Sequence, residues 1–331
     1  KVDSKINLIK LIYKTNDLEI KKYLPKYNGI VELNNNDVKV SFDNKKLTIH
    51  SKGKFTTDKI TDELDLKITL KDENYHIKSK IKLNNNPIAV KFLNYIKEEN
   101  KSSLLNIELL IKKNKNILVK NFVFKESENI FLVNDLNLDN NFKINHVNNL
   151  EFDFLNNNKI RNKISFIKNK KNYLLSGTVL DGSIIIDKML KPGKEKNIIS
   201  KIFSNFNSNI SLDINKTYID KDSYLNELHG NLVFVNNNLV DLNLMSNLLD
   251  DKKFNLTIKT DENGEEVTTL FSGYAKPFVK KYKFVKGFDA GSLDFYSSKK
   301  DGISKSQLKI YDFKLKELPI LTKILTLASL Q

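Results

Sequence analysis

The residues best suited to chemistry in this chain are four histidines and a few serines and aspartates beside glycine. The histidines are His50, His76, His146 and His229, and they are widely separated in sequence. Their spacing excludes a helical zinc pair of the HExxH type. The absence of cysteine excludes zinc-finger ligands, a cysteine nucleophile and a disulfide framework. Each histidine is therefore predicted to be an isolated surface residue.

The candidates for a nucleophile and a base are Ser183 and Asp289. They lie in two glycine-containing stretches, "GTVLDGS" at 177–183 and "FDAGSLDF" at 288–295. Neither stretch contains a G-x-S-x-G elbow, a P-loop or a dinucleotide-binding pattern. Asp-Gly and Ala-Gly between apolar strands are typical of turns. The sequence thus predicts a protein that is not an enzyme and that has no cofactor and no metal site.

The elements that position these residues show a hydrophobic period of two. In "YHIKSKIKL", for example, Tyr75, Ile77 and Ile81 alternate with lysines and a histidine. Such alternation indicates strands with one apolar face and one solvated face, which are normally antiparallel. We expect a mostly β fold: an elongated, twisted antiparallel sheet or meander that forms a hydrophobic groove, with a few short α-helices.

The apolar faces of these strands supply the candidate binding residues. A long meander must hide its apolar face by closing as a barrel, by stacking as a sandwich, or by holding an apolar ligand. The alternation alone leaves both an ordinary core and an open groove as interpretations. The groove candidates are Leu64, Leu66, Ile68, Tyr75, Ile77, Ile81, Phe152, Phe154, Leu212, Ile214, Leu242 and Leu244.

Asparagine-rich breaks separate the alternating runs and predict hairpin turns, since asparagine tolerates the left-handed conformation. These breaks are 34–36, 84–86, 156–158, 236–238 and "DENG" at 261–264.

Helical spacing and proline positions predict short helices at 15–27, 87–101 and 195–206. Most glycines lie from Gly177 onward, and we therefore expect a β-rich groove segment at 1–175 and a second β segment at 176–331, with one continuous sheet as the alternative.

The formal net charge of +15 raises the question of nucleic acid binding, because lysine and arginine neutralise phosphates. Arg161 is the only arginine among 55 basic residues, although bidentate recognition of phosphates and bases favours arginine. The charge is therefore interpreted mainly as a solubilising lysine coat, and no nucleic acid partner is expected.

The chain ends with an alternating strand followed by Pro319 and a compact apolar helix, "PILTKILTLASL". Leucine and isoleucine cover one broad face of this amphipathic helix. Its length of roughly 20 Å is too short to cross a bilayer. We expect it to close one end of the groove, because its polar face carries only Lys323 whereas helices that lie on membranes usually carry several basic residues.

This ending resembles the C-terminal region of the AsmA-like family of bacterial envelope proteins. The resemblance covers about residues 270–330 and consists of a Gly-x-Leu-Asp strand, an Asp-Phe strand, a proline and a leucine-rich helix ending in Ala-Ser-Leu. The matching positions are Gly273, Pro277, Gly287, Phe288, Gly291, Leu293, Asp294, Asp312, Phe313, Pro319, Leu325, Ala328, Ser329 and Leu330.

The resemblance implies a periplasmic β-groove that conducts phospholipid between the inner and outer membranes. It also implies attachment to the inner membrane through an anchor that this chain does not contain, and the lack of an initial methionine suggests a piece of a longer protein. The expected partner is phospholipid or another acyl lipid. The alternatives are a structural or assembly factor for outer-membrane proteins that pairs through its strand edges, and, third, a nucleic acid binder. The oligomeric state stays open.

Overall fold

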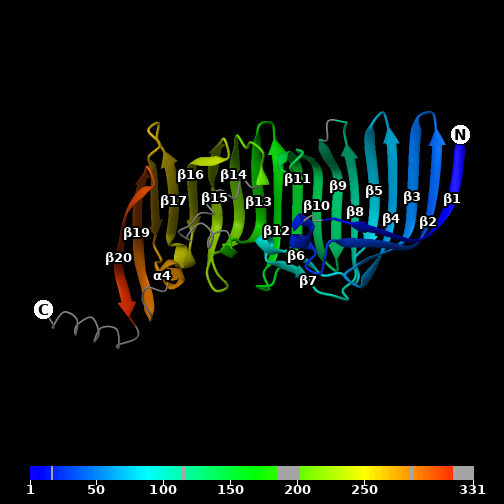
Figure 1. Ribbon diagram of the computed structural model, residues 1–331. Coiled ribbons are helices and arrows are strands. Elements are labelled where there is room, and N and C mark those ends of the chain that lie inside the picture. The colour runs from blue at the N-terminus through cyan, green and yellow to red at the C-terminus, as the bar shows by residue number, and fades with distance from the viewer. Residues whose placement is uncertain (16–17, 114–115, 185–201, 283–286, 316–331) are drawn as a thin grey trace. The chain divides into compact units, whose positions relative to one another are not determined.

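The computed structural model describes residues 1–15, 18–113, 116–184, 202–282 and 287–315 (Figure 1). The described part is dominated by long strands, and eighteen of them belong to one sheet, while β6 and β7 form a separate pair. The chain divides into two compact units: unit 1 comprises Lys1–Lys170 and Lys188–Phe206, and unit 2 comprises Lys171–Asp187 and Asn207–Gln331.

Unit 1 is an antiparallel meander in which each long strand pairs with the next one along the chain, from β1 to β5 and then from β8 to β12. Helix α1 is inserted between β1 and β2, and the short β6–β7 hairpin is inserted between β5 and β8. The elements are β1 (Val2–Lys14), α1 (Leu18–Tyr23), β2 (Ile30–Asp43), β3 (Lys46–Thr57), β4 (Ile60–Lys71), β5 (Asn74–Lys82), β6 (Ile88–Val90), η1 (Lys91–Leu93), β7 (Tyr95–Lys97), β8 (Ser103–Ile111), β9 (Ile117–Glu126), β10 (Asn129–Leu138), β11 (Ile144–Leu155) and β12 (Arg161–Asn169).

Unit 2 begins with a parallel pair, β13 and β14, and continues as an antiparallel meander to β20. The short helix α4 is inserted between β18 and β19. The elements are β13 (Asn172–Asp181), β14 (Ser208–Tyr218), β15 (Tyr224–Val235), β16 (Asn238–Asn247), η2 (Leu249–Asp251), β17 (Lys253–Thr260), β18 (Glu266–Ser272), α4 (Lys276–Tyr282), β19 (Phe288–Lys300) and β20 (Ile303–Leu315).

The predicted fold class is confirmed: the protein is mostly β, with a long antiparallel sheet and few short helices. The alternating runs all lie in strands, since a period of two places the apolar residues on one face of the sheet and the polar residues on the other. The expected division at 175/176 lies within β13 and, as a domain boundary, stays a prediction.

Three of the five predicted asparagine turns connect consecutive strands as hairpins: 156–158, 236–238 and 261–264. The stretch 84–86 instead leads from β5 into the β6–β7 insertion. The prediction for 34–36 is wrong, because these residues lie inside β2 at a shift of register against β3. Asn35 takes the left-handed conformation there. The amide of the buried Asn36 donates to the carbonyl oxygens of Asn34 and Lys54, at 3.0 and 2.9 Å, and so replaces ladder hydrogen bonds that the bulge interrupts.

The predicted helices have different outcomes. Helix α1 confirms a helix within 15–27. The helix predicted at 87–101 is wrong, since β6, a single 3-10 turn and β7 occupy this stretch. Asn94 is left-handed and reverses the chain, so that Tyr95 and Lys97 are both buried while Ile96 points to solvent. The C-terminal helix, and most of the helix predicted at 195–206, lie outside the described residues.

Candidate apolar binding face

The apolar face of unit 1 is assembled by strand register. Ile68 of β4 lies opposite Ile77 of β5, and Leu64 lies opposite Ile81. Leu66 lies opposite Ser79, and Tyr75 lies opposite Leu70. The structure thus brings all six predicted groove residues of β4 and β5 onto one face, as the alternation requires. We call these six residues the open patch.

The same face continues over the neighbouring strands. On β3, Ile49 lies opposite Ile68, and on β8, Leu109 lies opposite Ile77. The register of β9, β10 and β11 then aligns aromatic residues, with Phe131 between Phe124 and Phe152. Unit 1 therefore presents a laterally continuous apolar surface that crosses its strands.

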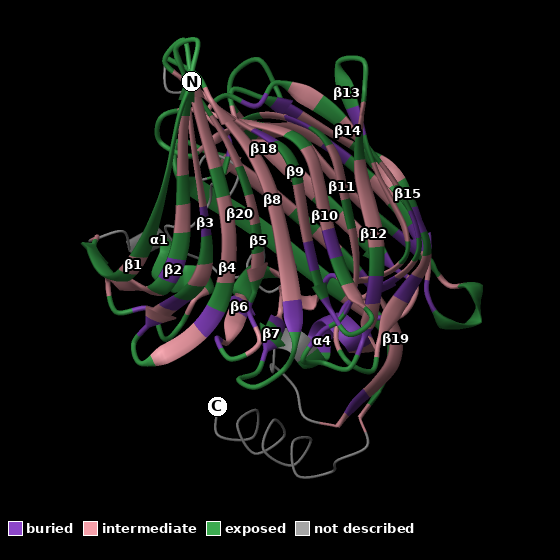
Figure 2. Cartoon of the chain, turned by 90° about the vertical axis from the view of Figure 1, so that its right-hand side faces the viewer, coloured by how far each residue is buried: buried purple, intermediate pink, exposed green. Residues whose placement is uncertain are grey.

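Burial divides this surface into two regions. None of the side chains of the open patch is buried, and Tyr75 is 44% exposed. In contrast, Phe154 of β11 is only 1% exposed. Figure 2 shows the same contrast, with most of the strands intermediate in burial and buried segments beside β6 and β7. Among the described residues, no element buries the open patch.

The β6–β7 hairpin (Ile88–Lys97) causes this division by covering one part of the face. The ring of Tyr95 packs against three phenylalanines, with centroid distances of 4.8 Å to Phe131, 5.9 Å to Phe154 and 6.3 Å to Phe124. Ile88, Val90 and Leu93 pack against the same aromatic cluster. The hairpin supplies a local second layer over β9–β11.

A buried polar network fixes the hairpin to the sheet. The Lys97 ammonium group donates to the carbonyl oxygens of Asn86, Glu98 and Asn84, at 2.7, 3.2 and 3.3 Å. Asp62 of β4 accepts hydrogen bonds from the backbone amides of Asn85 and Asn86, at 2.9 and 3.0 Å. Burial lowers the pKa of Lys97, because desolvation penalises the charged form.

Tyr95 completes the attachment through its hydroxyl group, which donates to Glu126 at 3.0 Å. Burial, and then the charge of Glu126, raise the pKa of Tyr95 above its ordinary value. Tyr95, Lys97 and Asp62 were not predicted from the sequence. Most of their partners lie in segments distant in sequence, and no local spacing of residues predicts these contacts.

Unit 2 has a corresponding apolar face, but its predicted residues are more deeply enclosed. Ile214 and Leu242 are 0% and 2% exposed, while Leu212 and Leu244 are partly buried against the main hydrophobic cluster. Helix α4 contributes Phe278 and Val279 to this cluster. In unit 2, Ile214 and Leu242 thus serve as core, while Leu212 and Leu244 stay partly buried beside the cluster.

A separate hollow of about 300 Å³ lies in unit 2 and does not belong to this apolar face. Asn255, Phe271, Asp294 and Lys309, which line it, occupy one cross-strand row on the opposite, solvated side of β17–β20. Its lining mixes amide, charged and aromatic groups and provides no continuous apolar surface.

The residues first considered for chemistry have ordinary surroundings. His50, His76 and His229 each contact a carboxylate, of Asp65, Glu108 and Asp213, at 2.7, 2.7 and 3.2 Å. The prediction of isolated histidines is therefore wrong for these three, because strand register places an acid on the adjacent strand. The fourth, His146, is partly buried, and this burial lowers its pKa.

Ser183 and Asp289 have partners typical of turns and strand ends. The amide of Ser183 donates to the Asp181 side chain at 3.0 Å, and Asp289 forms an ion pair with Lys276 at 2.8 Å. Across the described residues, no group of three or more His, Cys, Asp or Glu side chains is placed to hold a metal ion.

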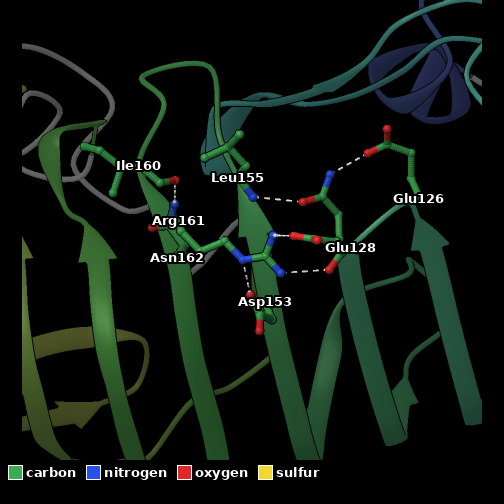
Figure 3. Close-up of polar contacts among 8 residues, drawn as sticks. Glu126, Glu128, Asp153, Leu155, Ile160, Arg161 and Asn162 are labelled. Carbon is green, nitrogen blue, oxygen red and sulfur yellow. Dashed lines mark hydrogen bonds and ion pairs between the residues drawn. The ribbon is translucent and has the colours of Figure 1, made fainter.

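Arg161, the single arginine, joins two hairpins of unit 1 (Figure 3). Its Nε donates to Asp153 at 2.5 Å, and a terminal nitrogen donates to the carbonyl oxygen of Glu128 at 2.8 Å. Beside it, the Asn129 side chain accepts from the Leu155 amide at 2.9 Å and donates to Glu126 at 2.5 Å. The fork of the guanidinium group thus secures the turn between β9 and β10 against β11 and β12.

Among the described residues that carry the family resemblance, Gly273 directly follows β18, Pro277 lies in α4 and Gly287 directly precedes β19, while the others lie on β19 and β20. Gly287 and Gly291 are left-handed, and Asp294 faces solvent opposite Lys309. Asp312 is also left-handed, and the ring of Phe313 stacks on Phe288 at 5.5 Å. Pro319 and Ser329 lie outside the described residues.

Gly291 has a specific steric requirement, which gives a first testable prediction. Its φ of +77° is unfavourable for other residues, and a Cβ atom there would lie 2.6 Å from the carbonyl oxygen of Tyr311. We expect Gly291→Ala to lower the free energy of unfolding by at least about 2 kcal/mol, from left-handed strain and from this clash. Urea unfolding followed by far-UV circular dichroism measures the change. Gly302→Ala is the control, because its Cβ would meet open space at a similar φ of +79°; equal losses would contradict the clash.

Comparisons with known proteins do not assign the chain to a class: no family model, no curated protein and no solved structure matches it. The AsmA-like resemblance therefore stays a prediction. Among the described residues there is no helix of the length and apolar character required to span a membrane.

Proposed function

We propose that unit 1 binds the acyl chains of phospholipid on its open patch and acts as a non-enzymatic lipid conduit. The observation that carries the proposal is the incomplete burial of Leu64, Leu66, Ile68, Ile77 and Ile81, on the part of the apolar face that no described element buries. An acyl chain would remove this surface from water, with a gain of about 25 cal/mol per Å².

The geometry of the strands suits a linear apolar ligand. Neighbouring strands lie about 4.8 Å apart, so the face across β3, β4, β5 and β8 extends roughly 14 Å perpendicular to the strands. Mostly aliphatic side chains line this span, and its polar groups are the uncharged hydroxyls of Ser51, Ser79 and Tyr75. This lining favours recognition by shape and apolar character over recognition of one charged headgroup. The β6–β7 hairpin would limit the bound chain on one side.

The cellular setting is part of the same proposal and depends on the AsmA-like resemblance alone. We place the protein in the periplasm, where it would carry phospholipid between the inner and outer membranes. Attachment to the inner membrane would then require a segment other than those described.

The test uses two aspartates placed opposite each other on the open patch, Ile68→Asp with Ile77→Asp. We expect the purified wild-type chain to carry phospholipid in native mass spectra and after solvent extraction, and the double variant to lose it. A charge in an acyl-binding site is unfavourable, whereas we expect the fold to tolerate it at Ile68 and Ile77, which are only partly buried. Circular dichroism and thermal unfolding check the fold.

The matched control is Thr48→Asp with Thr69→Asp, since these residues also lie opposite each other on neighbouring strands but on the solvated face. This variant should retain the lipid. A wild-type chain without lipid would contradict the proposal. So would unfolding of the Ile68→Asp/Ile77→Asp variant, because it would show that the patch is an ordinary closed core.

One observation favours a second function, an assembly factor that binds client strands. Strand β1 pairs only with β2 among the described strands, and it exposes large apolar side chains, including Ile9 at 76% and Tyr13 at 65%. Such an edge can add a further strand through backbone hydrogen bonds. Lipid-free protein that binds extended peptides at β1 would favour this function.

A further inference from the structure

The solvated face of unit 1 carries a row of four lysines and one histidine that strand register places side by side. Lys5 of β1 lies opposite Lys39 of β2, and Lys39 lies opposite His50 of β3. His50 lies opposite Lys67 of β4, which lies opposite Lys78 of β5. These five residues, on the neighbouring strands β1–β5 (Figure 1), are called the basic row.

The next row on the same face has the opposite character. There Asp37 lies opposite Lys52, Lys52 opposite Asp65, and Asp65 opposite Lys80, so that charges alternate in sign across the strands. Alternation is the favourable arrangement, because directly opposed like charges destabilise a sheet. The basic row departs from it at every step, although an abundant lysine coat would permit either pattern.

Carboxylates contact only the middle residue of the basic row, His50, and one end of it, Lys78. Lys78 contacts Glu108 at 3.3 Å, and His50 contacts Asp65 at 2.7 Å. Lys5, Lys39 and Lys67 are exposed, and none of them forms an ion pair with a described residue. Three ammonium groups therefore lie on one line without a protein counter-charge, which is an arrangement suited to an external anion.

We propose that the basic row binds a linear acidic polysaccharide. The row is one residue wide and spans roughly 19 Å, from five strands spaced about 4.8 Å apart. It is flanked by the alternating row on one side and by the row Asp3, Ser41, Thr48, Thr69 and His76 on the other. A single charged chain matches this narrow line, whereas a planar anionic membrane would also meet the acidic residues of the neighbouring row.

The flanking residues favour a sugar polymer over other linear polyanions. The hydroxyl groups of Thr48 and Thr69 can donate hydrogen bonds to sugar hydroxyl groups and accept hydrogen bonds from them. Polyphosphate has no such hydroxyl groups along its chain. Single-stranded nucleic acid is usually bound with aromatic side chains that stack on bases, and these three rows contain no Phe, Tyr or Trp. The inference is independent of acyl binding, because it concerns the opposite face of the sheet.

The experiment measures calorimetric binding of oligogalacturonate, which has one carboxylate per sugar, at increasing salt concentration. We expect Lys39→Gln with Lys67→Gln to weaken binding at least about tenfold at low salt, and to reduce the slope of log affinity against log salt by about one per lysine. The control is Lys259→Gln with Lys305→Gln, two exposed lysines of unit 2, which changes the net charge equally. This control should bind almost as the wild type does.

A second variant separates binding from stability. Lys67→Glu places an acid between His50 and Lys78, so it should raise the melting temperature while it abolishes binding. Equal losses in the unit 2 control, no effect of the row variants, or no binding by the wild type would overturn the proposal. Stronger row-dependent binding of polyphosphate, of a single-stranded oligonucleotide or of anionic vesicles would overturn the assignment to a polysaccharide.

Discussion

Replacing Phe154 with alanine is expected to lower the free energy of unfolding by about 3–5 kcal/mol, which is the usual loss for a large aromatic side chain in a packed core. Phe154 is 1% exposed, and its ring lies 5.0 Å from Phe131 and 5.9 Å from Tyr95, measured between centroids. The cavity would open beneath the β6–β7 hairpin, where both the sheet and the hairpin lose contacts. Urea unfolding by circular dichroism measures the loss.

Phe152 provides the matched control, since it has the same side chain on the same strand and the same face but is only partly buried. Phe152→Ala should therefore cost clearly less than Phe154→Ala. The chain contains no tryptophan, so far-UV circular dichroism is preferable to intrinsic fluorescence. Equal losses at the two positions would show that the hairpin does not form a distinct second layer.

This comparison also bears on acyl binding. If Phe154 stabilises the fold strongly and residues of the open patch do not, the apolar face of unit 1 contains a packed region and an unpacked region next to each other. Only the unpacked region can exchange a ligand without loss of the fold. The Ile68→Asp/Ile77→Asp variant should then separate lipid binding from stability.

The strands could be predicted from the sequence because apolar and polar residues alternate along each one. In β4, for example, Leu64, Leu66 and Ile68 alternate with charged residues, and this period of two depends only on local backbone geometry. The positions of the remaining candidates on strand faces follow in the same way. Local pattern was therefore sufficient for the fold class.

Burial could not be predicted in this way. Ile68, Phe154 and Ile214 all occupy alternating apolar positions, yet Ile68 is only partly buried and the other two are buried. The difference arises from cover supplied by other parts of the chain, such as the β6–β7 hairpin. The sequence therefore left a groove and a core as alternatives, because the covering segment has no local signature on the strand that it covers.

The helix predicted at 87–101 failed for a related reason. Its apolar spacing fits a helix, but an extended backbone allows Tyr95 to reach the aromatic cluster and Lys97 to reach three carbonyl oxygens. These non-local contacts outweigh helix propensity, which is a weak preference. The basic row could not be predicted from the sequence either, because its residues become neighbours only through the register of five strands.

Asp62→Ala is expected to destabilise unit 1 by at least about 3 kcal/mol, because it removes a buried acceptor from three donors, two of which belong to the buried Asn86. The carboxylate is 3% exposed and accepts from the amides of Asn85 and Asn86 and, at 2.8 Å, from the Asn86 side chain. Its negative charge also favours the charged form of the buried Lys97. Without it, the ammonium group would lose the largest of its compensating charges while remaining buried.

The loss should be concentrated in the attachment of the β6–β7 hairpin. We therefore expect faster limited proteolysis between residues 84 and 102 in the variant, together with a lower urea midpoint. Asp65→Ala is the control, because Asp65 lies on the same strand but its side chain is 40% exposed and contacts His50 at the surface. Its removal should change stability by no more than about 0.5 kcal/mol. Equal changes of the urea midpoint and of the proteolysis rate in the two variants would contradict this prediction. They would show that apolar contacts alone attach the hairpin and that the polar network does not stabilise it.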